Sequence, residues 1–200
     1  GTQTLEVIRA ENEREPGSYV VSGISVGRSG NAALAQAAEF DIPLIVVDDD
    51  TARYEVASTG RVRVDADATA LIDDADVVIN GVVGFAGLLV TTETLRSGKR
   101  LGLANKESLI AAGPIVQPLR STPGAEIVPV DSEHCALHQC LRSSFDAGRE
   151  VAKLLLTASG GPFRGRSGAD LAEVTVEHAL QHPTWTMGPK ITIDSSTLMN

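Results

Sequence analysis

Cysteine, aromatic residues and positive charge are scarce in this chain of 200 residues. Two cysteines, Cys135 and Cys140, cannot form the framework of a secreted disulfide scaffold, so a reducing, cytoplasmic compartment is expected. Seventeen basic against 26 acidic residues give a net charge of −9, which argues against a broad basic surface for nucleic acid or an anionic membrane. The long apolar run from Gly81 to Val90 is about half of the roughly 20 residues that span a bilayer. Neither nucleic acid nor membrane is therefore an expected partner.

Strand-like and helix-like segments alternate along the first two thirds of the chain. Short β-branched or continuously apolar runs, which are typical of strands, cover residues 19–25, 43–47, 75–82 and 100–104. Helical patterns cover residues 2–9, 31–40, 67–72, 88–96 and 108–112, the last stopping at Gly113-Pro114. This alternation predicts an α/β fold with a mainly parallel sheet and helices on both faces. Ligands of such sheets bind beyond the carboxyl ends of the strands.

The pattern changes after Pro129, where polar and small residues begin to cluster at the ends of predicted strands. A domain boundary is expected there, between residues 1–129 and residues 130–200. The clusters that carry chemistry lie after this boundary or just before it.

The first cluster is Leu-Ala-Asn-Lys-Glu-Ser-Leu at residues 103–109, where a predicted strand passes into a helix. Free backbone N–H groups and the positive end of the helix dipole favour an anion at such a position, and Lys106 adds a mobile positive charge. A lysine at the start of a helix is also a common solvent-facing residue. On this motif alone, the solvent-facing lysine is the favoured interpretation.

The second cluster is Val-Pro-Val-Asp-Ser-Glu-His at residues 128–134, which delivers Asp131 and Glu133 from a strand end. Carboxylates in this arrangement suit Mg²⁺ or Mn²⁺. Acidic residues also stabilise the first turn of a helix without any metal. The two interpretations are evenly matched on this motif alone.

An alternative metal site overlaps this cluster. It consists of His134, Cys135, His138 and Cys140, a compact set of zinc-type ligands. Tetrahedral zinc needs four ligands that converge, usually from two elements. On one continuous helix the two cysteines point away from the histidine face, so packing of these residues in the protein interior is the favoured interpretation.

Two further clusters follow. An apolar run at residues 154–157, read as a strand, breaks into Ser159-Gly-Gly, whose backbone N–H groups can approach an oxyanion. A plain turn explains that segment equally well. Residues 182–190 place Trp185 in a segment bounded by Pro and Gly, as in a closing flap, and residues 191–200 read as a strand with a hydroxyl- and amide-rich end.

Five segments in order, LANKESL, PVDSEH, LTASGGPF, HPTWTMG and IDSSTLMN, together resemble the 1-deoxy-D-xylulose 5-phosphate reductoisomerase family over essentially the whole chain. The resemblance implies an enzyme that uses NADPH and Mg²⁺ or Mn²⁺ to rearrange and reduce 1-deoxy-D-xylulose 5-phosphate to 2-C-methyl-D-erythritol 4-phosphate in non-mevalonate isoprenoid biosynthesis. It implies a Rossmann-like NADP-binding domain over residues 1–129 and the start of an α/β catalytic domain over residues 130–200. Members are typically homodimers.

The resemblance also assigns roles to individual residues. Cofactor binding falls to Gly1, Gly27, Arg28, Ser29, Asn105, Glu107, Met187 and Gly188, with Arg28 reading the 2′-phosphate that separates NADP from NAD. Metal ligation falls to Asp131 and Glu133. Binding of the phosphorylated sugar falls to Lys106, Ser132, Glu133, Ser159, His182, Trp185, Ser195 and Asn200. Catalysis is assigned to Lys106, Glu133 and His182.

The chain departs from the family pattern at both ends. Gly1-Thr-Gln-Thr-Leu5 looks like the end of the family's dinucleotide-binding loop without its first strand, and Asn200 precedes the family's Lys-Gly-Leu-Glu, which would supply a phosphate-binding lysine and a third carboxylate ligand. These 200 residues are therefore expected to be an internal fragment that is inactive by itself. Two alternatives remain open, namely an NADP-binding homologue without turnover and a zinc-binding module.

Overall fold

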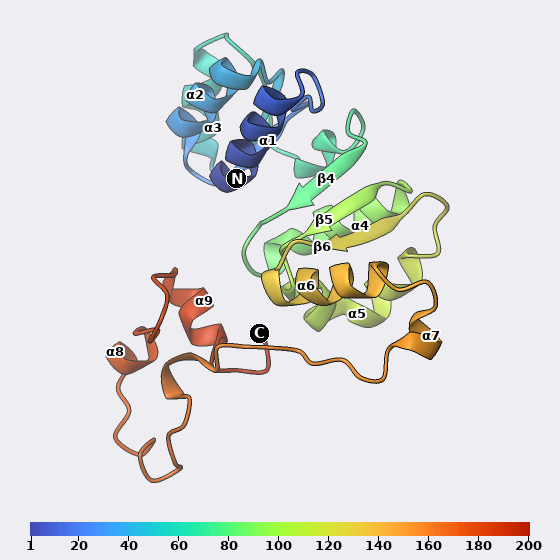
Figure 1. The fold of residues 1–200 in the computed structure, drawn as a ribbon. Helices are drawn as coiled ribbons and strands as arrows, with labels where there is room; N and C mark the ends of the chain where they lie inside the picture. Colours follow the sequence, from blue (N-terminus) through green and yellow to red (C-terminus); the bar gives the residue numbers. More distant parts are fainter.

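Two parallel sheets of three strands each carry the fold, and the computed structural model describes residues 1–200 (Figure 1). The strands are β1 Ile24–Val26, β2 Leu44–Val47, β3 Arg63–Asp65, β4 Val77–Asn80, β5 Arg100–Leu103 and β6 Glu126–Pro129. The helices are α1 Thr2–Arg14, α2 Gly30–Phe40, α3 Asp50–Ser58, α4 Leu88–Arg96, α5 Glu107–Leu119, α6 Ser132–Arg142, α7 Ala147–Glu150, α8 Val176–Ala179 and α9 Pro189–Asp194. Short 3₁₀ turns are η1 Ala68–Leu71, η2 Phe85–Gly87 and η3 Gly161–Phe163. The parallel α/β fold predicted from the alternating pattern is confirmed.

The first sheet has the order β1-β2-β3 and is built on a strand that is buried along its whole length. Ile45 and Val47 of β2 pack with α2 and α3 and are fully excluded from solvent. Burial of side chains of this size contributes about 1.5–3 kcal/mol each. The 3₁₀ turn η1 also contacts β1 and β2. The continuous apolar run in the sequence is therefore explained by burial on both faces of β2.

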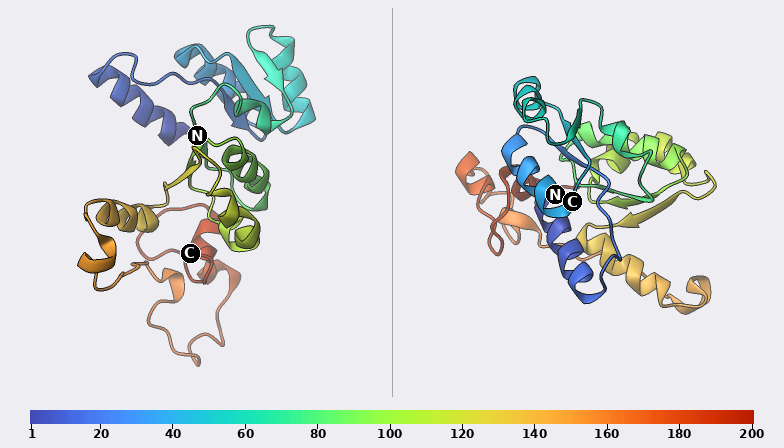
Figure 2. Two further views of the ribbon diagram at one scale, coloured as in Figure 1. Left: turned by 90° about the vertical axis from the view of Figure 1, so that its right-hand side faces the viewer. Right: turned by 90° about the horizontal axis from the view of Figure 1, so that it is seen from above.

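The second sheet has the order β4-β5-β6. Leu101 and Leu103 of β5 form its core with Leu95 of α4 and Val116 of α5, all nearly or fully buried. Helix α6 packs against β6, and Figure 2 shows α4 and α6 on opposite sides of this sheet. The carboxyl ends of β5 and β6 lead directly into α5 and α6. The turns at this end therefore bring residues 104–107 and 130–133 close together.

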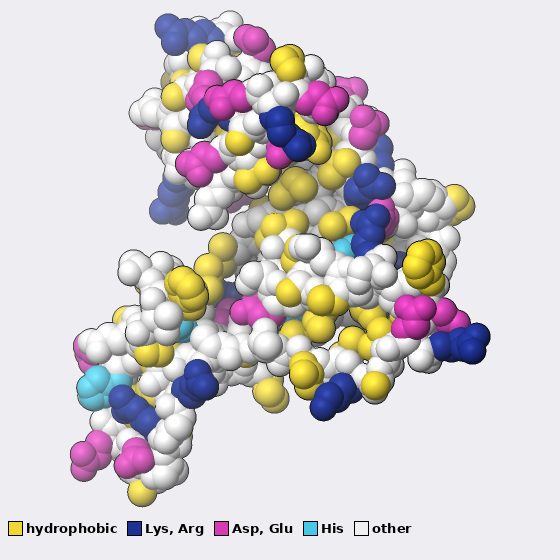
Figure 3. Space-filling model, viewed as in Figure 1, with side chains coloured by type: hydrophobic (Ala, Val, Ile, Leu, Met, Phe, Trp, Pro, Cys, Tyr) yellow, Lys and Arg dark blue, Asp and Glu magenta, His cyan; other side chains and the backbone are white.

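No hydrogen bonds join the two sheets, so β1 and β4 are both edge strands. Val77 and Ile79 of β4 are 43% and 44% exposed, although they are β-branched and apolar. Figure 3 shows hydrophobic side chains gathered in the hollow between the residues of the first sheet and those of the second. These two strands therefore present open backbone edges beside apolar side chains.

Several predicted elements differ from the structure. The strand over residues 19–25 is shortened to Ile24–Val26, and the helix expected to stop at Gly113-Pro114 continues as α5 to Leu119 beyond a kink at Ala112. Pro114 lacks the N–H of a continuous helix but is tolerated directly after the kink, in the first turn of the second segment. Helix α3 and strand β3 lie in stretches where no element was predicted.

The two strands predicted in the last third of the chain are wrong. Residues 154–157 form no strand, and Leu154, Leu155 and Leu156 are more than half exposed because no other strand among these 200 residues pairs with them. The segment after Gly188 is helix α9 instead of a strand. Pro189 stands at its first position, where the fixed φ of proline favours helix and its missing N–H costs nothing. Residues 130–200 thus contain helices and turns but no strand in this structure.

None of the helices is both long and apolar enough to cross a bilayer.

Candidate functional site

The turn between β5 and α5 is fixed by the buried amide of Asn105, which is 1% exposed. Its Nδ2 donates to the carbonyl oxygens of Val82 at 2.5 Å and Gly84 at 2.7 Å, and its Oδ1 accepts from the backbone N–H of Ser108 at 3.0 Å. A Cβ on Gly87 would stand 2.6 Å from the same Nδ2, so only glycine fits there. Asn105 therefore orders the turn that follows β4. The cofactor role predicted for Asn105 would depend on the position of this turn.

A second buried amide, Asn80, was not singled out in the sequence. It ends β4, is 1% exposed, and donates from Nδ2 to Gly87 O at 2.8 Å and to Thr91 Oγ1 at 2.9 Å. Its Oδ1 accepts from the N–H of Val82 at 3.2 Å. An Asn at a strand end before three closely spaced glycines was the available signal. The two amides together hold the glycine-containing turn at residues 81–87.

Lys106 brings together three segments that are far apart in the sequence. Its Nζ donates to Asn200 Oδ1 at 2.6 Å and lies 3.7 Å from Asp131 Oδ2. The side chains of Lys106 and Asp131 are only 17% and 18% exposed. The alternative of a solvent-facing lysine is therefore wrong, because Lys106 is a partly buried cation that faces an acid and an amide. Three predicted site residues meet at this point.

The predicted metal ligands lie at the junction of β6 and α6, with Asp131 as the residue before the helix and Glu133 in its first turn. Asp131 Oδ1 accepts a hydrogen bond of 2.6 Å from His134 Nδ1, and Glu133 Oε2 accepts one of 2.7 Å from Ser132 Oγ. Burial opposes the charged form of Asp131. The bond from His134 and the positive charge of Lys106 outweigh this effect and hold the pKa of Asp131 below its ordinary value.

These residues fit a hard divalent cation as two members of its coordination shell. Asp131 Oδ2 lies beyond hydrogen-bond distance of Lys106, and Ser132 engages only one of the two Glu133 oxygens. Mg²⁺ is commonly held by one or two carboxylates, with water and substrate oxygens completing an octahedron. The 200 residues bring no three His, Cys, Asp or Glu side chains together around one point. The fit is therefore to an ion that takes its other ligands from outside this set.

The zinc alternative loses support for the same reason, because residues 134, 135, 138 and 140 do not converge. His134 is bonded to Asp131, and Cys135 Sγ accepts from the Gln139 amide at 3.2 Å. Both cysteines are free thiols.

A second group of predicted residues forms around Ser159 and His182. Nδ1 of His182 accepts from the backbone N–H groups of Thr184 at 3.1 Å and Trp185 at 2.9 Å, so Nδ1 carries no proton. In the neutral ring the proton is then on Nε2, which donates to Ser159 Oγ at 3.0 Å. That oxygen also accepts from Gly161 N–H at 3.2 Å. With both its lone pairs engaged, the Ser159 hydroxyl has its hydrogen free to donate to a further acceptor.

The loop at Gly160 and Gly161 packs tightly against the end of α9. Gly161 has a φ of +65°, and a Cβ there would stand 2.7 Å from Ser195 Oγ and closer still to Ser196 Oγ, so a side chain is excluded by both backbone and contact. Ser195 is 7% exposed and donates to Thr192 O at 2.6 Å. Ser195 therefore lines the same loop as Ser159 and His182, although its own hydrogen is engaged within the helix.

The predicted flap residues lie on the surface. Trp185 is 62% exposed, Met187 is half-buried, and Gly188 is the residue before α9. The flap is tied to the rest of this group through the backbone at Thr184 and Trp185.

Glu107 has a partner that was not predicted from the sequence. Its Oε1 accepts from Gly84 N–H at 3.2 Å and forms an ion pair with Lys190 of α9, which also lies 2.5 Å from Asp194. Burial opposes ionisation of Glu107, but the Lys190 and Gly84 bonds outweigh it and lower the pKa of Glu107. Burial also acts to lower the pKa of Lys190, and the two acids raise it. The Lys-x-x-x-Asp spacing was visible in the sequence, whereas the pairing with Glu107, 83 residues away, was not.

The remaining predicted cofactor residues lie beyond β1 and at the chain start. Arg28 is 88% exposed, with Nε 3.4 Å from Asp49 Oδ2, and Ser29 precedes α2. Asp49 itself accepts from Ala52 N–H at the start of α3. Gly1 is exposed at the start of α1. Arg28 is thus held at the carboxyl ends of β1 and β2 with its guanidinium open to solvent.

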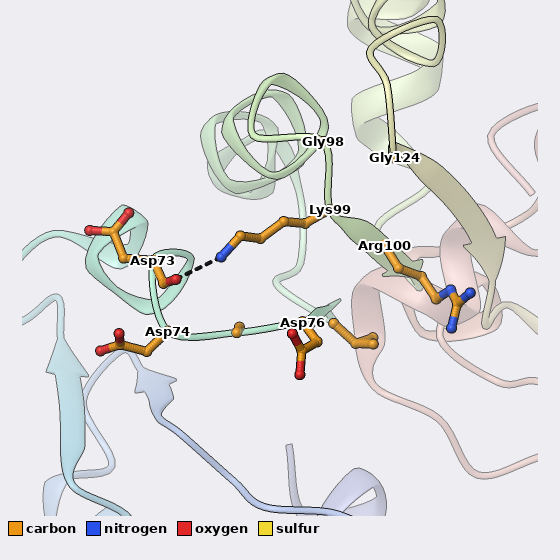
Figure 4. Close-up of a pocket in the computed structure, with 9 residues that line it drawn as sticks. Asp73, Asp74, Asp76, Gly98, Lys99, Arg100 and Gly124 are labelled. Carbon is orange, nitrogen blue, oxygen red and sulfur yellow. Dashed lines mark hydrogen bonds between the residues drawn. The ribbon is translucent and has the colours of Figure 1, made fainter.

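A polar pocket lies elsewhere, at the amino ends of β4 and β5 (Figure 4). Asp73, Asp74 and Asp76 line it on one side, and Lys99 and Arg100 on the other. Lys99 Nζ donates to the backbone carbonyl oxygens of Ile72 and, at 2.7 Å, of Asp73. Its ammonium group is therefore engaged by the backbone. Because this pocket is at the opposite end of the strands from Lys106, it is separate from the site described above.

Comparison with known proteins agrees with this geometry. The family description for 1-deoxy-D-xylulose 5-phosphate reductoisomerase matches residues 1–113, and that for its C-terminal domain matches residues 127–200. Relatives with the same description from Mycobacterium marinum and Geobacillus kaustophilus are 49% and 45% identical over all of this chain. The chain spans only 48% and 53% of those proteins, about half of their length.

Solved structures give the same result. DOX-P reductoisomerase in complex with NADPH, fosmidomycin and magnesium is 33% identical, with a TM-score of 0.78 over 96% of this chain and 51% of that one. The 1-deoxy-D-xylulose 5-phosphate reductoisomerase of Zymomonas mobilis in complex with NADPH is 34% identical, with a TM-score of 0.80 over 94% of this chain and 49% of that one. Fold, motifs and sequence thus agree, and the chain belongs to the 1-deoxy-D-xylulose 5-phosphate reductoisomerase family.

Proposed function

We propose that the protein containing this chain is an NADPH- and divalent-metal-dependent enzyme that rearranges and reduces 1-deoxy-D-xylulose 5-phosphate to 2-C-methyl-D-erythritol 4-phosphate. The observation that carries the proposal is the meeting of Lys106, Asp131 and Asn200 at the carboxyl ends of β5 and β6. Relatives at 49% and 45% identity bear the reductoisomerase name. Residues 1–129 would bind the nucleotide and residues 130–200 would supply metal and substrate contacts.

The phosphate of the substrate is assigned to the group around Ser159. The free hydroxyl hydrogen of Ser159 and the ammonium group of Lys106 are suitable donors to a phosphate oxygen. His182 donates a hydrogen bond from Nε2–H to the Ser159 oxygen and so orients that hydroxyl. Ser195 and Asn200 would complete the binding of the substrate, and Trp185 would close over it.

Asp131 and Glu133 would hold Mg²⁺ or Mn²⁺, with Ser132 beside them on the substrate. The relative solved with fosmidomycin also contains magnesium. When bound, the metal supplies Lewis-acid stabilisation of negative charge on substrate oxygens while the carbon skeleton rearranges. Lys106, placed 3.7 Å from Asp131, contributes positive charge to the same region and restrains Asn200. His134 fixes the orientation of the Asp131 carboxylate.

NADPH would bind along the carboxyl ends of the strands. Arg28 is open to solvent beside Ser29 and Gly27, and a guanidinium there suits the 2′-phosphate of NADPH. Asn105 and Glu107 order the turn at residues 81–87 and would contact the cofactor, with Gly1, Met187 and Gly188 as further contacts. Closure of residues 182–188 would exclude water from the reacting centre. A homodimer and a cytoplasmic location remain predictions.

Turnover in the full-length protein tests this proposal against a non-catalytic NADP-binding homologue. Oxidation of NADPH is followed at its absorbance band after addition of 1-deoxy-D-xylulose 5-phosphate, with and without Mg²⁺ or Mn²⁺. Metal-dependent oxidation with formation of the methylerythritol product is expected. Binding of NADPH without any oxidation would instead support the non-catalytic homologue.

A further inference from the structure

The side chain of Lys190 connects α9 to the turn between β5 and α5. It stands in the first turn of α9 and forms ion pairs with Glu107, at the start of α5, and with Asp194, one turn further along α9. The carboxylate side chains of Glu107 and Asp194 are 12% and 15% exposed. Two largely buried acids therefore depend on one ammonium group.

Glu107 carries the connection onward to the turn that follows β4. Its Oε1 accepts from the backbone N–H of Gly84, within the turn that Asn105 also binds through Val82 and Gly84. The position of the Glu107 carboxylate is thus set by Gly84 on one side and by Lys190 on the other. Removal of the ammonium would leave this carboxylate, and Asp194, without its positive partner in a partly buried setting, which is costly.

Neighbouring residues of opposite charge hold the two ends of the segment 190–200. Lys106 donates to Asn200 at its far end, and Glu107 pairs with Lys190 at its near end. The segment between them includes Ser195, which lines the Gly161 loop beside Ser159. The β5–α5 turn therefore touches both the candidate nucleotide turn and the candidate phosphate-binding segment.

The residues immediately before Lys190 are the flap, residues 182–188. At its beginning, His182 accepts from the backbone of Thr184 and Trp185 and donates to Ser159. At its end, Gly188 and Pro189 lead within two residues to Lys190. The flap is consequently anchored on the phosphate side by His182 and on the nucleotide side by Lys190.

We propose that Lys190 is a positioning residue that couples the nucleotide site to the substrate site, by fixing the end of the flap to the turn at Gly84 through Glu107. This inference rests on the proposed function. A nucleotide that orders the Gly84 turn thereby favours one position of α9 and the flap, and a phosphorylated ligand that orders the flap favours the same position of the turn. Such coupling is reciprocal by thermodynamic necessity.

The test measures this coupling in the full-length protein with two probes, NADPH and the phosphonate fosmidomycin in the presence of Mg²⁺. The Kd of fosmidomycin is determined by calorimetry with and without saturating NADPH, and the ratio of the two values is the coupling factor. Couplings of this kind are about 5- to 150-fold. In wild type, NADPH is expected to tighten fosmidomycin binding by a factor in this range.

Lys190→Gln is expected to reduce the coupling factor to within about twofold of one, and Lys190→Arg to restore most of it, because the guanidinium can pair with both acids. Substitution of a residue that is needed only for folding would weaken the binding of NADPH and of fosmidomycin alike. The ratio of the two fosmidomycin Kd values, with and without NADPH, would then stay at its wild-type value. Lys153→Gln is the matched control, since Lys153 is an exposed lysine that forms no ion pair in the structure. If Lys190→Gln does not fold, Glu107→Gln removes the same ion pair from the other side and should give the same loss of coupling.

The outcomes separate the two claims. Failure of the wild-type protein to bind NADPH and fosmidomycin would overturn the proposed function. Binding of both ligands with a coupling factor of one in wild type, or with a wild-type factor retained by Lys190→Gln and Glu107→Gln, would overturn the role of Lys190 alone.

Discussion

Replacement of Ser159 by alanine tests the hydrogen-bond geometry around the Gly160-Gly161 loop. Two donors, His182 Nε2–H and Gly161 N–H, occupy the lone pairs of the Ser159 hydroxyl, so its hydrogen is available to an outside acceptor. A hydrogen bond to a charged group contributes about 1.5–3 kcal/mol. Since about 1.4 kcal/mol is a factor of ten, Ser159→Ala should weaken binding of a phosphonate about 10- to 150-fold.

The assay is the Kd of fosmidomycin in the full-length protein, measured with saturating NADPH and Mg²⁺. The Kd of NADPH should stay within about twofold of wild type, because the hydrogen bonds of the Ser159 hydroxyl go to Gly161 and His182 and not to residues 1–129, where NADPH is proposed to bind. Ser58→Ala is a matched control, as its hydroxyl is exposed and bonds only to a carbonyl of its own helix. A fosmidomycin Kd within twofold of wild type in Ser159→Ala would refute the assignment of the free hydroxyl to the phosphate group.

Three further substitutions address the metal, the nucleotide and the ion pair. Asp131→Asn should raise the activation free energy by about 4 kcal/mol and so lower metal-dependent turnover about a thousandfold. It should also raise the Mg²⁺ concentration needed for half-maximal rate, and unchanged kinetics would show that Asp131 is not a ligand. Arg28→Gln should reduce the preference for NADPH over NADH about 10- to 100-fold, because a charged contact to the 2′-phosphate is lost. Steady-state kinetics with both cofactors measure this preference, and an unchanged value would contradict the role of Arg28. The lowered pKa of Glu107 means that its contribution to stability is present above its ordinary value of 4.5 and is lost as the pH falls through the folded-state pKa. Urea unfolding should therefore show the stability difference between wild type and Glu107→Gln shrinking from about pH 6 to about pH 3, and a constant difference would contradict the ion pair with Lys190.

The parallel fold could be predicted from the sequence because burial leaves a direct pattern. Residues 44–47 are apolar without interruption since both faces of β2 are covered. The strand predicted at Ile191-Thr-Ile is wrong, because alternating β-branched residues favour a strand locally but Pro189 starts a helix that packs on the Gly161 turn. The strand predicted at residues 154–157 is also wrong, because an apolar run shows the need for burial without showing whether a partner strand is present.

The candidate site was predictable where a motif places several polar residues at one strand end. Lys106 and Asp131, each predicted as a site residue, meet because parallel strands bring their carboxyl ends to one edge of the sheet. The pairing of Lys190 with Glu107 was not predictable, since nothing in either local sequence encodes a contact across 83 residues. The proton position on His182 likewise depends on two backbone donors that only the folded flap supplies.

The unpaired edges of β1 and β4 have a consequence for handling this polypeptide in isolation. Each presents a row of free backbone donors and acceptors, and on β4 these stand beside the half-exposed Val77 and Ile79. Such edges are templates on which strands of other molecules can add. A solution of the 200-residue polypeptide should therefore scatter more light as its concentration rises, and a lysine in place of Ile79 should delay that rise.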